Sequence, residues 1–232
     1  LLYAMDENQL EQYLFQETEE LMSYSSSFEA RSRDRFVVFI NELFELGSHK
    51  EYNTMFHSDR VVLENKSRRL MDYLEVESFI DRIEIVSLNE EVTRFTTKLI
   101  KEEKGFDNIS YDEVKSKITV LLPPLSVNAL LELKGAVNGK VDSYSKSVGM
   151  LRSQSAQQVK AGIDNEYIFP PDAAKVAKEI DLIGSFYRKN AKIFGIAKKT
   201  ILLPNYKPED DEEVELLEFA PEASLLLGKS VD

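Results

Sequence analysis

The sequence predicts an all-α protein: an elongated helical bundle with a long antiparallel helical hairpin over about 126–194 and an acidic C-terminal tail. The 232 residues include only 9 glycines and 7 prolines, too few for the turns that many short strands need. Apolar side chains recur at the three- and four-residue spacing of amphipathic helices. With 43% hydrophobic and 30% charged residues, the composition suits helices that have one apolar stripe and a wide solvated face.

Three helices are expected in the N-terminal part. The first is capped by Asp6 and carries apolar side chains as far as Met22. The second spans about 28–44 and ends at Gly47, because glycine readily adopts the left-handed conformation that follows a helix. The third covers about 58–74. Together they predict an N-terminal helical bundle.

The following segments carry mixed signals. Segment 79–86 has apolar spacing that fits a helix, whereas Arg82-Ile83-Glu84-Ile85 alternates like a strand, and we favour the helix. A clearer helix covers about 90–104, with Asn89 as its N-cap, acids in its first turn and lysines near its end.

A short helix follows, because Ser110 begins a capping-box pattern, and Pro123-Pro124 ends it. We therefore expect three regions along the chain. They are an N-terminal helical bundle at 1–122, a long hairpin packing on it at 123–203, and an acidic, partly apolar tail at 204–232. The alternative is that the three form one continuous domain.

The hairpin prediction rests on two apolar seams near heptad spacing. The first lies in a helix over about 126–162 and is formed by Val137, Val141, Tyr144, Val148 and Leu151. The second helix begins at Pro170-Pro171, and its seam runs from Val176 to Phe194. Such coiled-coil spacing indicates helix–helix packing, either inside one bundle or between subunits.

The segment after Pro204 combines acidic residues with apolar islands. A run of acids at 209–213 precedes Leu216, Leu217 and Phe219, and three leucines follow at 225–227. Segments of this kind fold onto a partner's groove, with the acids steering association. The alternative is that the segment packs back on its own bundle, and the sequence leaves both open.

A basic cluster near the end of the second long helix is the best candidate for binding nucleic acid or a membrane surface. It consists of Arg188, Lys189, Lys192, Lys198 and Lys199. The favoured alternative is a cationic helix end that complements the helix dipole and docks against the acidic tail.

The overall charge and the composition limit the function classes. The net charge of −12 is spread as −9, +4 and −7 over residues 1–100, 101–200 and 201–232, which disfavours non-specific binding to nucleic acid. Cysteine is absent, which removes disulfides and thiolate sites. No apolar run approaches the length of a transmembrane helix. We expect a cytoplasmic or nuclear protein.

Catalytic and metal-binding signals are weak. His49 and His57 stand eight residues apart, which does not match the spacing of a helical metal pair. The segment Gly135 to Lys140 resembles a phosphate loop, but it has one residue too few between its glycines and no preceding strand. We therefore expect no catalytic residue, no cofactor and no metal.

The sequence favours a non-enzymatic helical adaptor or scaffold subunit of a larger assembly. It would bind other protein subunits, as a homo- or hetero-oligomer, through the seams and the apolar islands of the tail. The alternative is a nucleic-acid or membrane-surface binding protein that uses the 188–199 basic cluster. No motif specific to a known family is present.

Overall fold

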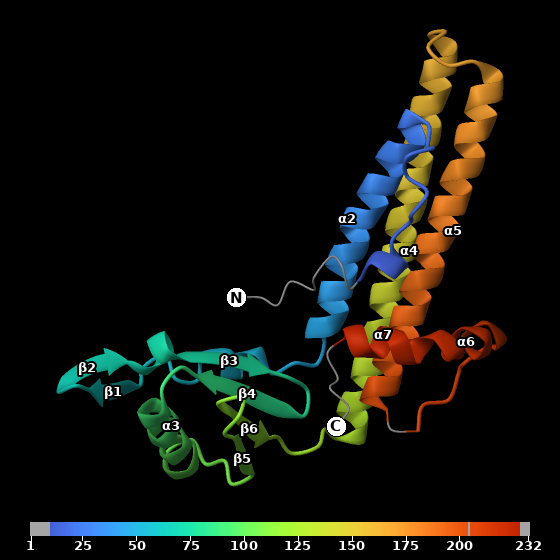
Figure 1. The fold of residues 1–232 in the computed structure, drawn as a ribbon. Helices are drawn as coiled ribbons and strands as arrows, with labels where there is room; N and C mark the ends of the chain where they lie inside the picture. The colour runs from blue at the N-terminus through green and yellow to red at the C-terminus, as the bar shows by residue number, and fades with distance from the viewer. Residues whose placement is uncertain (1–9, 204, 228–232) are drawn as a thin grey trace. The chain divides into compact units, whose positions relative to one another are not determined.

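The computed structural model describes residues 10–203 and 205–227, and the chain divides into two compact units. A helical unit contains the described residues up to Leu46 and from Val127 onward, and an α/β unit contains Gly47–Ser126 (Figure 1). The prediction of an all-α protein is wrong, because the α/β unit holds β-strands in two sheets.

Three long helices form the helical unit: α2 (Ser23–Glu45), α4 (Val127–Asp164) and α5 (Pro170–Leu202). They run side by side in Figure 1. The helices expected over about 126–162 and 170–194 are therefore α4 and α5. Residues early in α2 contact the later part of α4, and residues late in α2 contact its earlier part, so these two helices are antiparallel.

The core of this unit is rich in aromatic rings. Phe36 lies at its centre and contacts the rings of Tyr144, Tyr187 and Phe194. The buried Tyr187 hydroxyl donates a 2.6 Å hydrogen bond to the buried carboxylate of Glu29. Because a buried charge is tolerated only with partners, this bond and the Arg33 guanidinium together keep Glu29 inside the bundle.

The helix expected from Asp6 to Met22 does not continue through residues 14–22. Its cap, Asp6, lies outside the described residues, Leu10 is helical, and the 3-10 turn η1 (Glu11–Tyr13) follows it. The segment after it is bound to α5 instead: the Phe15 amide donates to the Tyr187 hydroxyl, and the Met22 amide donates to Glu179. This docking buries Phe15 and leaves Leu14, Leu21 and Met22 half-buried.

The α/β unit has a two-stranded ribbon and a four-stranded antiparallel sheet. The ribbon pairs β1 (Arg60–Leu63) with β2 (Lys66–Arg69). The sheet has the order β3-β4-β6-β5. Its strands are β3 (Leu74–Ser78), β4 (Arg82–Ser87), β5 (Ile109–Asp112) and β6 (Lys117–Leu121), and α3 (Glu90–Glu102) connects β4 to β5. Two 3-10 turns, η2 (Lys50–Thr54) and η3 (Leu70–Tyr73), complete the unit.

The helices expected over 58–74, 79–86 and from Ser110 to Pro123 are therefore wrong. In β4 and β6 alternate residues are buried, so the two-residue period at Arg82 to Ile85 was the deciding signal. The helix expected over about 90–104 is α3, and the Asn89 side chain caps it by accepting from the Glu91 amide at 2.8 Å.

Candidate protein-binding site

The side chains of the first seam lie inside the helical unit. Val137, Tyr144, Val148 and Leu151 are buried against α2 and α5, and Val141 is half-buried. A Cβ atom at Gly195 would stand 2.6 Å from Val141 Cγ2, so the two helices approach closely because position 195 has no side chain. The second seam, from Val176 to Phe194, is buried as well. In this structure both seams form the core of one unit.

The C-terminal segment packs on α5. It forms α6 (Asp211–Leu216), the 3-10 turn η4 (Leu217–Phe219) and α7 (Ala220–Leu226). Leu216 is buried, Leu217 is half-buried, and Phe219 is exposed. Of the three candidate binding residues of this segment, only Phe219 is exposed, and 41% of its surface is open to solvent.

The basic cluster is engaged by the chain itself. Lys199 is only 2% exposed and is ion-paired with Glu213 and Glu209. Lys192 pairs with Glu212 at 2.5 Å, and the Lys198 ammonium donates to the Phe44 carbonyl at 3.2 Å.

The two remaining members of the cluster also have partners. Lys189 lies over the Phe219 ring, 5.3 Å from its centroid, and the Arg188 guanidinium donates to the Gly184 carbonyl. The acidic segment thus occupies much of the surface on which a polyanion would have to bind.

The ion pairs shift the pKa values of the docked acids. The hydrogen bond from Lys134 lowers the pKa of Glu209. Burial opposes ionisation of Glu213, but the hydrogen bonds from Lys199 and Tyr206 outweigh it and lower the pKa of that carboxyl. Burial, together with the bond to Glu213, raises the pKa of the Tyr206 hydroxyl, which keeps it a hydrogen-bond donor.

We predict that the C-terminal segment detaches in acid. Because the pKa of both Glu209 and Glu213 is lower in the docked state than the usual 4.5, docking is fully favoured above about pH 4.5 and weakens as the pH falls through the lowered values. Methyl NMR of the buried Ala220 and Ala223 should show both signals moving to random-coil positions, while buried Ala173 of α5 keeps its shift. Parallel loss of all three signals would contradict local detachment.

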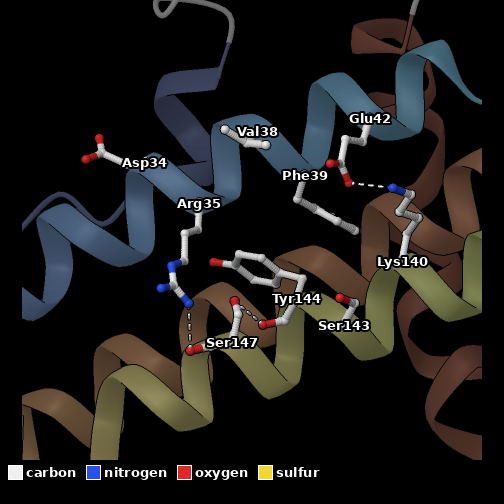
Figure 2. A pocket seen from close by; sticks show the side chains of 9 residues that line it. All are labelled: Asp34, Arg35, Val38, Phe39, Glu42, Lys140, Ser143, Tyr144 and Ser147. Atoms are coloured by element: carbon white, nitrogen blue, oxygen red, sulfur yellow. Dashed lines mark hydrogen bonds and ion pairs between the residues drawn. The ribbon is translucent and has the colours of Figure 1, made fainter. Parts of the chain in front are cut away.

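A groove between α2 and α4 has a volume of about 360 Å³ (Figure 2). The buried rings of Phe39 and Tyr144 stack at its floor with centroids 5.0 Å apart. Figure 2 shows three of the charged groups at the rim engaged, whereas Asp34 lies apart from them: Lys140 pairs with Glu42 at 2.8 Å, and Arg35 donates to the Ser147 carbonyl. These charges are taken up by one another or by backbone at the rim, so the groove does not bring them together on a reacting atom.

The turn between α4 and α5 presents two large aromatic side chains to solvent. Tyr167 is 84% exposed and Phe169 is 73% exposed, and Ile163 beside them is also exposed. We call Ile163 to Phe169 the hairpin tip. Sequence reasoning missed this surface, because aromatic residues in a connection carry no helical period. The available signal was their position just before Pro170-Pro171, which begins the next helix.

The hairpin tip is fixed by hydrogen bonds and by one buried anchor. The Tyr167 amide donates to the Gly162 carbonyl at 2.8 Å, and the Asn165 side chain donates to the Ala161 carbonyl at 2.7 Å. Ile168 points inward and is buried against Gly162. The turn therefore holds its aromatic side chains outward in a defined geometry, which reduces the entropy lost when they bind.

The remaining candidates for chemistry are dispersed. His49 Nδ1 lies 3.2 Å from Glu51, and His57 is exposed. No group of three or more His, Asp or Glu side chains suited to a metal occurs within residues 10–203 and 205–227. The segment Gly135 to Lys140 is part of α4 and forms no loop. Among the described helices, none has the length and apolarity to cross a membrane.

Comparison with known proteins gives no family. The sequence matches no protein-family model and no curated protein. Among solved structures, the chain is similar to the solution structure of the ribosome recycling factor, with a TM-score of 0.42 and 14% sequence identity over 88% of this chain and 100% of that one. Similarity at this level assigns no function. The fold and the site define an α+β protein with a three-helix unit and an exposed aromatic hairpin tip.

Proposed function

We propose that this protein is a non-enzymatic adaptor that binds another protein subunit through the hairpin tip. The observation that carries the proposal is the exposure of Tyr167 and Phe169 on a turn held by backbone hydrogen bonds. Aromatic anchors on a preorganised turn are typical of the centre of a protein interface. The seams are occupied inside the unit, so the tip is the apolar surface best placed to meet a partner.

The charges around the tip indicate what the partner offers. Asp164 and Glu166 are exposed beside the aromatic side chains, and neither is ion-paired with another described residue. The partner should therefore supply an apolar pocket for the rings and a basic rim that attracts the two acids. Phe219 of the C-terminal segment is a second exposed aromatic side chain, but it lies under a lysine and far along α5 from the tip.

Replacing both aromatic side chains, Tyr167→Ser with Phe169→Ser, should abolish partner binding and leave the stability unchanged, because neither ring packs in the core. A photo-crosslinking amino acid at position 163 should trap one partner in extracts of the source cells. Excess unlabelled wild-type chain should compete for that partner, and the double variant should not.

Two controls make the result specific to the tip. The same crosslinker at Ser185, exposed on α5, should not trap this partner. A Leu182→Ser chain, which removes an exposed apolar side chain of α5, should compete as well as the wild type. If the double tip variant competed equally well, the tip would not be the binding surface.

A further inference from the structure

The β1–β2 ribbon has one anchored face and one open face. Val61 of β1 is buried in the core of the α/β unit, and Leu63 packs against it. In the antiparallel register Arg60 lies opposite Arg69 and Val62 opposite Ser67, and these four share the other face. All four residues of β2 are exposed, as is Val62. The ribbon therefore presents a solvated strand whose side chains are open on both faces.

The ribbon is strongly basic in an acidic protein. Arg60, Lys66, Arg68 and Arg69 lie within ten residues that hold one acid, in a chain of net charge −12. None of the four is ion-paired with another residue of the described part. Arg60 and Arg69 lie directly opposite each other, an arrangement of like charges that destabilises a strand pair. The strand register therefore places two arginines opposite each other although their charges repel.

The ribbon also has hydrogen-bonding capacity along its edge. Within the described residues β1 and β2 pair only with each other, so the outer edge of β2 is not covered by a strand. In an antiparallel pair, alternate residues direct their amide and carbonyl groups away from the partner strand. An extended peptide can bind such groups by adding a further strand, and its alternate side chains then meet those of β2.

We propose that the β1–β2 ribbon binds an extended acidic peptide of a partner protein, which adds as a strand along β2 and pairs its carboxylates or phosphates with the four basic side chains. Arginine forks match both groups bidentately. A short peptide needs only the four cations present, whereas a long nucleic acid would meet the negative field of the rest of the chain. The chain's own acidic run at 209–213 is already paired with lysines of the helical unit.

Lysines and arginines on an edge strand also prevent aggregation by blocking edge-to-edge pairing with another chain. The test must therefore distinguish peptide binding from this protective role. The probe is a fluorescent nine-residue peptide in which pairs of glutamates alternate with pairs of threonines, so that carboxylates face both sides of an added strand. Its binding is measured by anisotropy against the full chain at low and high salt. Wild type should bind it, and binding should weaken with salt. The same peptide with proline at alternate threonines should not bind, because proline cannot donate to a strand ladder.

The variant Arg60→Glu with Arg69→Glu should weaken peptide binding by about tenfold or more, as expected for reversing two ion pairs. The matched control is Arg94→Glu with Lys98→Glu on α3, which makes the same charge change at exposed side chains of the same unit. Arg60→Glu alone places opposite charges across the ribbon. It should leave the melting temperature unchanged or higher while binding still falls, which a purely structural role would not produce.

Four outcomes would overturn the proposal. The first is that wild type does not bind the peptide, and the second is that the α3 control loses as much peptide binding as the ribbon double variant. The third is that the proline peptide binds as well as the unmodified peptide. The fourth is that the ribbon binds single-stranded DNA or anionic vesicles in place of the peptide. The tip variant Tyr167→Ser with Phe169→Ser should bind the peptide normally. Failure of the ribbon is therefore distinguishable from failure of the hairpin tip.

Discussion

Val148→Asp should unfold the helical unit. Val148 is 2% exposed, and its methyl groups lie near Gly184 of α5, where the Phe28 ring also packs. A carboxylate there would be buried without a described cation beside it, and such changes cost about 4–5 kcal/mol or more, a large part of the roughly 5–15 kcal/mol that stabilises a typical domain. Thermal unfolding followed by helical circular dichroism should show a large drop in the midpoint or no transition.

Met150→Asp is the matched control for this substitution. Met150 lies two residues further along α4 and is 59% exposed, so aspartate there stays solvated and should change stability by only about 0.5 kcal/mol. The result that would contradict this is a Val148→Asp chain with the same melting temperature as Met150→Asp that no longer binds a partner subunit. The first seam would then pack between chains and would not belong to the core of this unit.

The long helices could be predicted from the sequence because their signals accumulate over many turns. The seam of α4 repeats its period from Val137 to Leu151, and Pro170-Pro171 marks the start of α5. The strands of the α/β unit are only four to six residues long, so each offers two or three alternations. Over such a length a helical and a strand period fit almost equally well.

Turn chemistry explains the rest of the missed sheet structure. Glu64 and Asn65 both have positive φ values, 49° and 60°, as the tight turn of a two-residue hairpin requires. Glycine would have signalled this turn, but Glu-Asn does not. Similarly, Asp112 accepts hydrogen bonds from the Val114 and Lys115 amides in the β5–β6 connection, where Ser110 and Glu113 mimic a capping box.

The candidate binding residues could be predicted only in part from the sequence. The sequence singled out the seam residues because they are apolar and periodic, but period alone cannot tell packing within a unit from packing between subunits. The basic cluster and the acidic segment were each visible, and their pairing depends on the chain folding back at about residue 205. The hairpin tip and the ribbon depend on exposure and register, which no single stretch of sequence encodes.

Removing the Glu213 carboxylate should release the C-terminal segment from α5. Glu213→Ala leaves the buried Lys199 ammonium with one ion pair, the longer 3.4 Å contact to Glu209. Breaking one side of a buried ion pair costs about 3–5 kcal/mol, because the remaining charge has lost its solvent and its partner. The segment can avoid this cost by detaching, which lets water reach Lys199. The measured loss is therefore limited to the docking free energy, and proteolysis at 205–215 should become fast while the three-helix core persists.

Two further variants separate the buried pair from surface charge. Glu212→Ala removes a carboxylate that is paired with Lys192 at an exposed position, and such a pair contributes only about 0–1 kcal/mol, so the segment should stay docked. Lys199→Met combined with Glu213→Leu replaces both buried charges by apolar groups, a change that is often neutral or stabilising. Docking should then recover relative to Glu213→Ala, because no unpaired charge remains under the segment. If the double variant were as protease-sensitive as Glu213→Ala, the detachment could not be ascribed to an unpaired Lys199. The ion pair itself, which apolar side chains cannot replace, would then be required for docking.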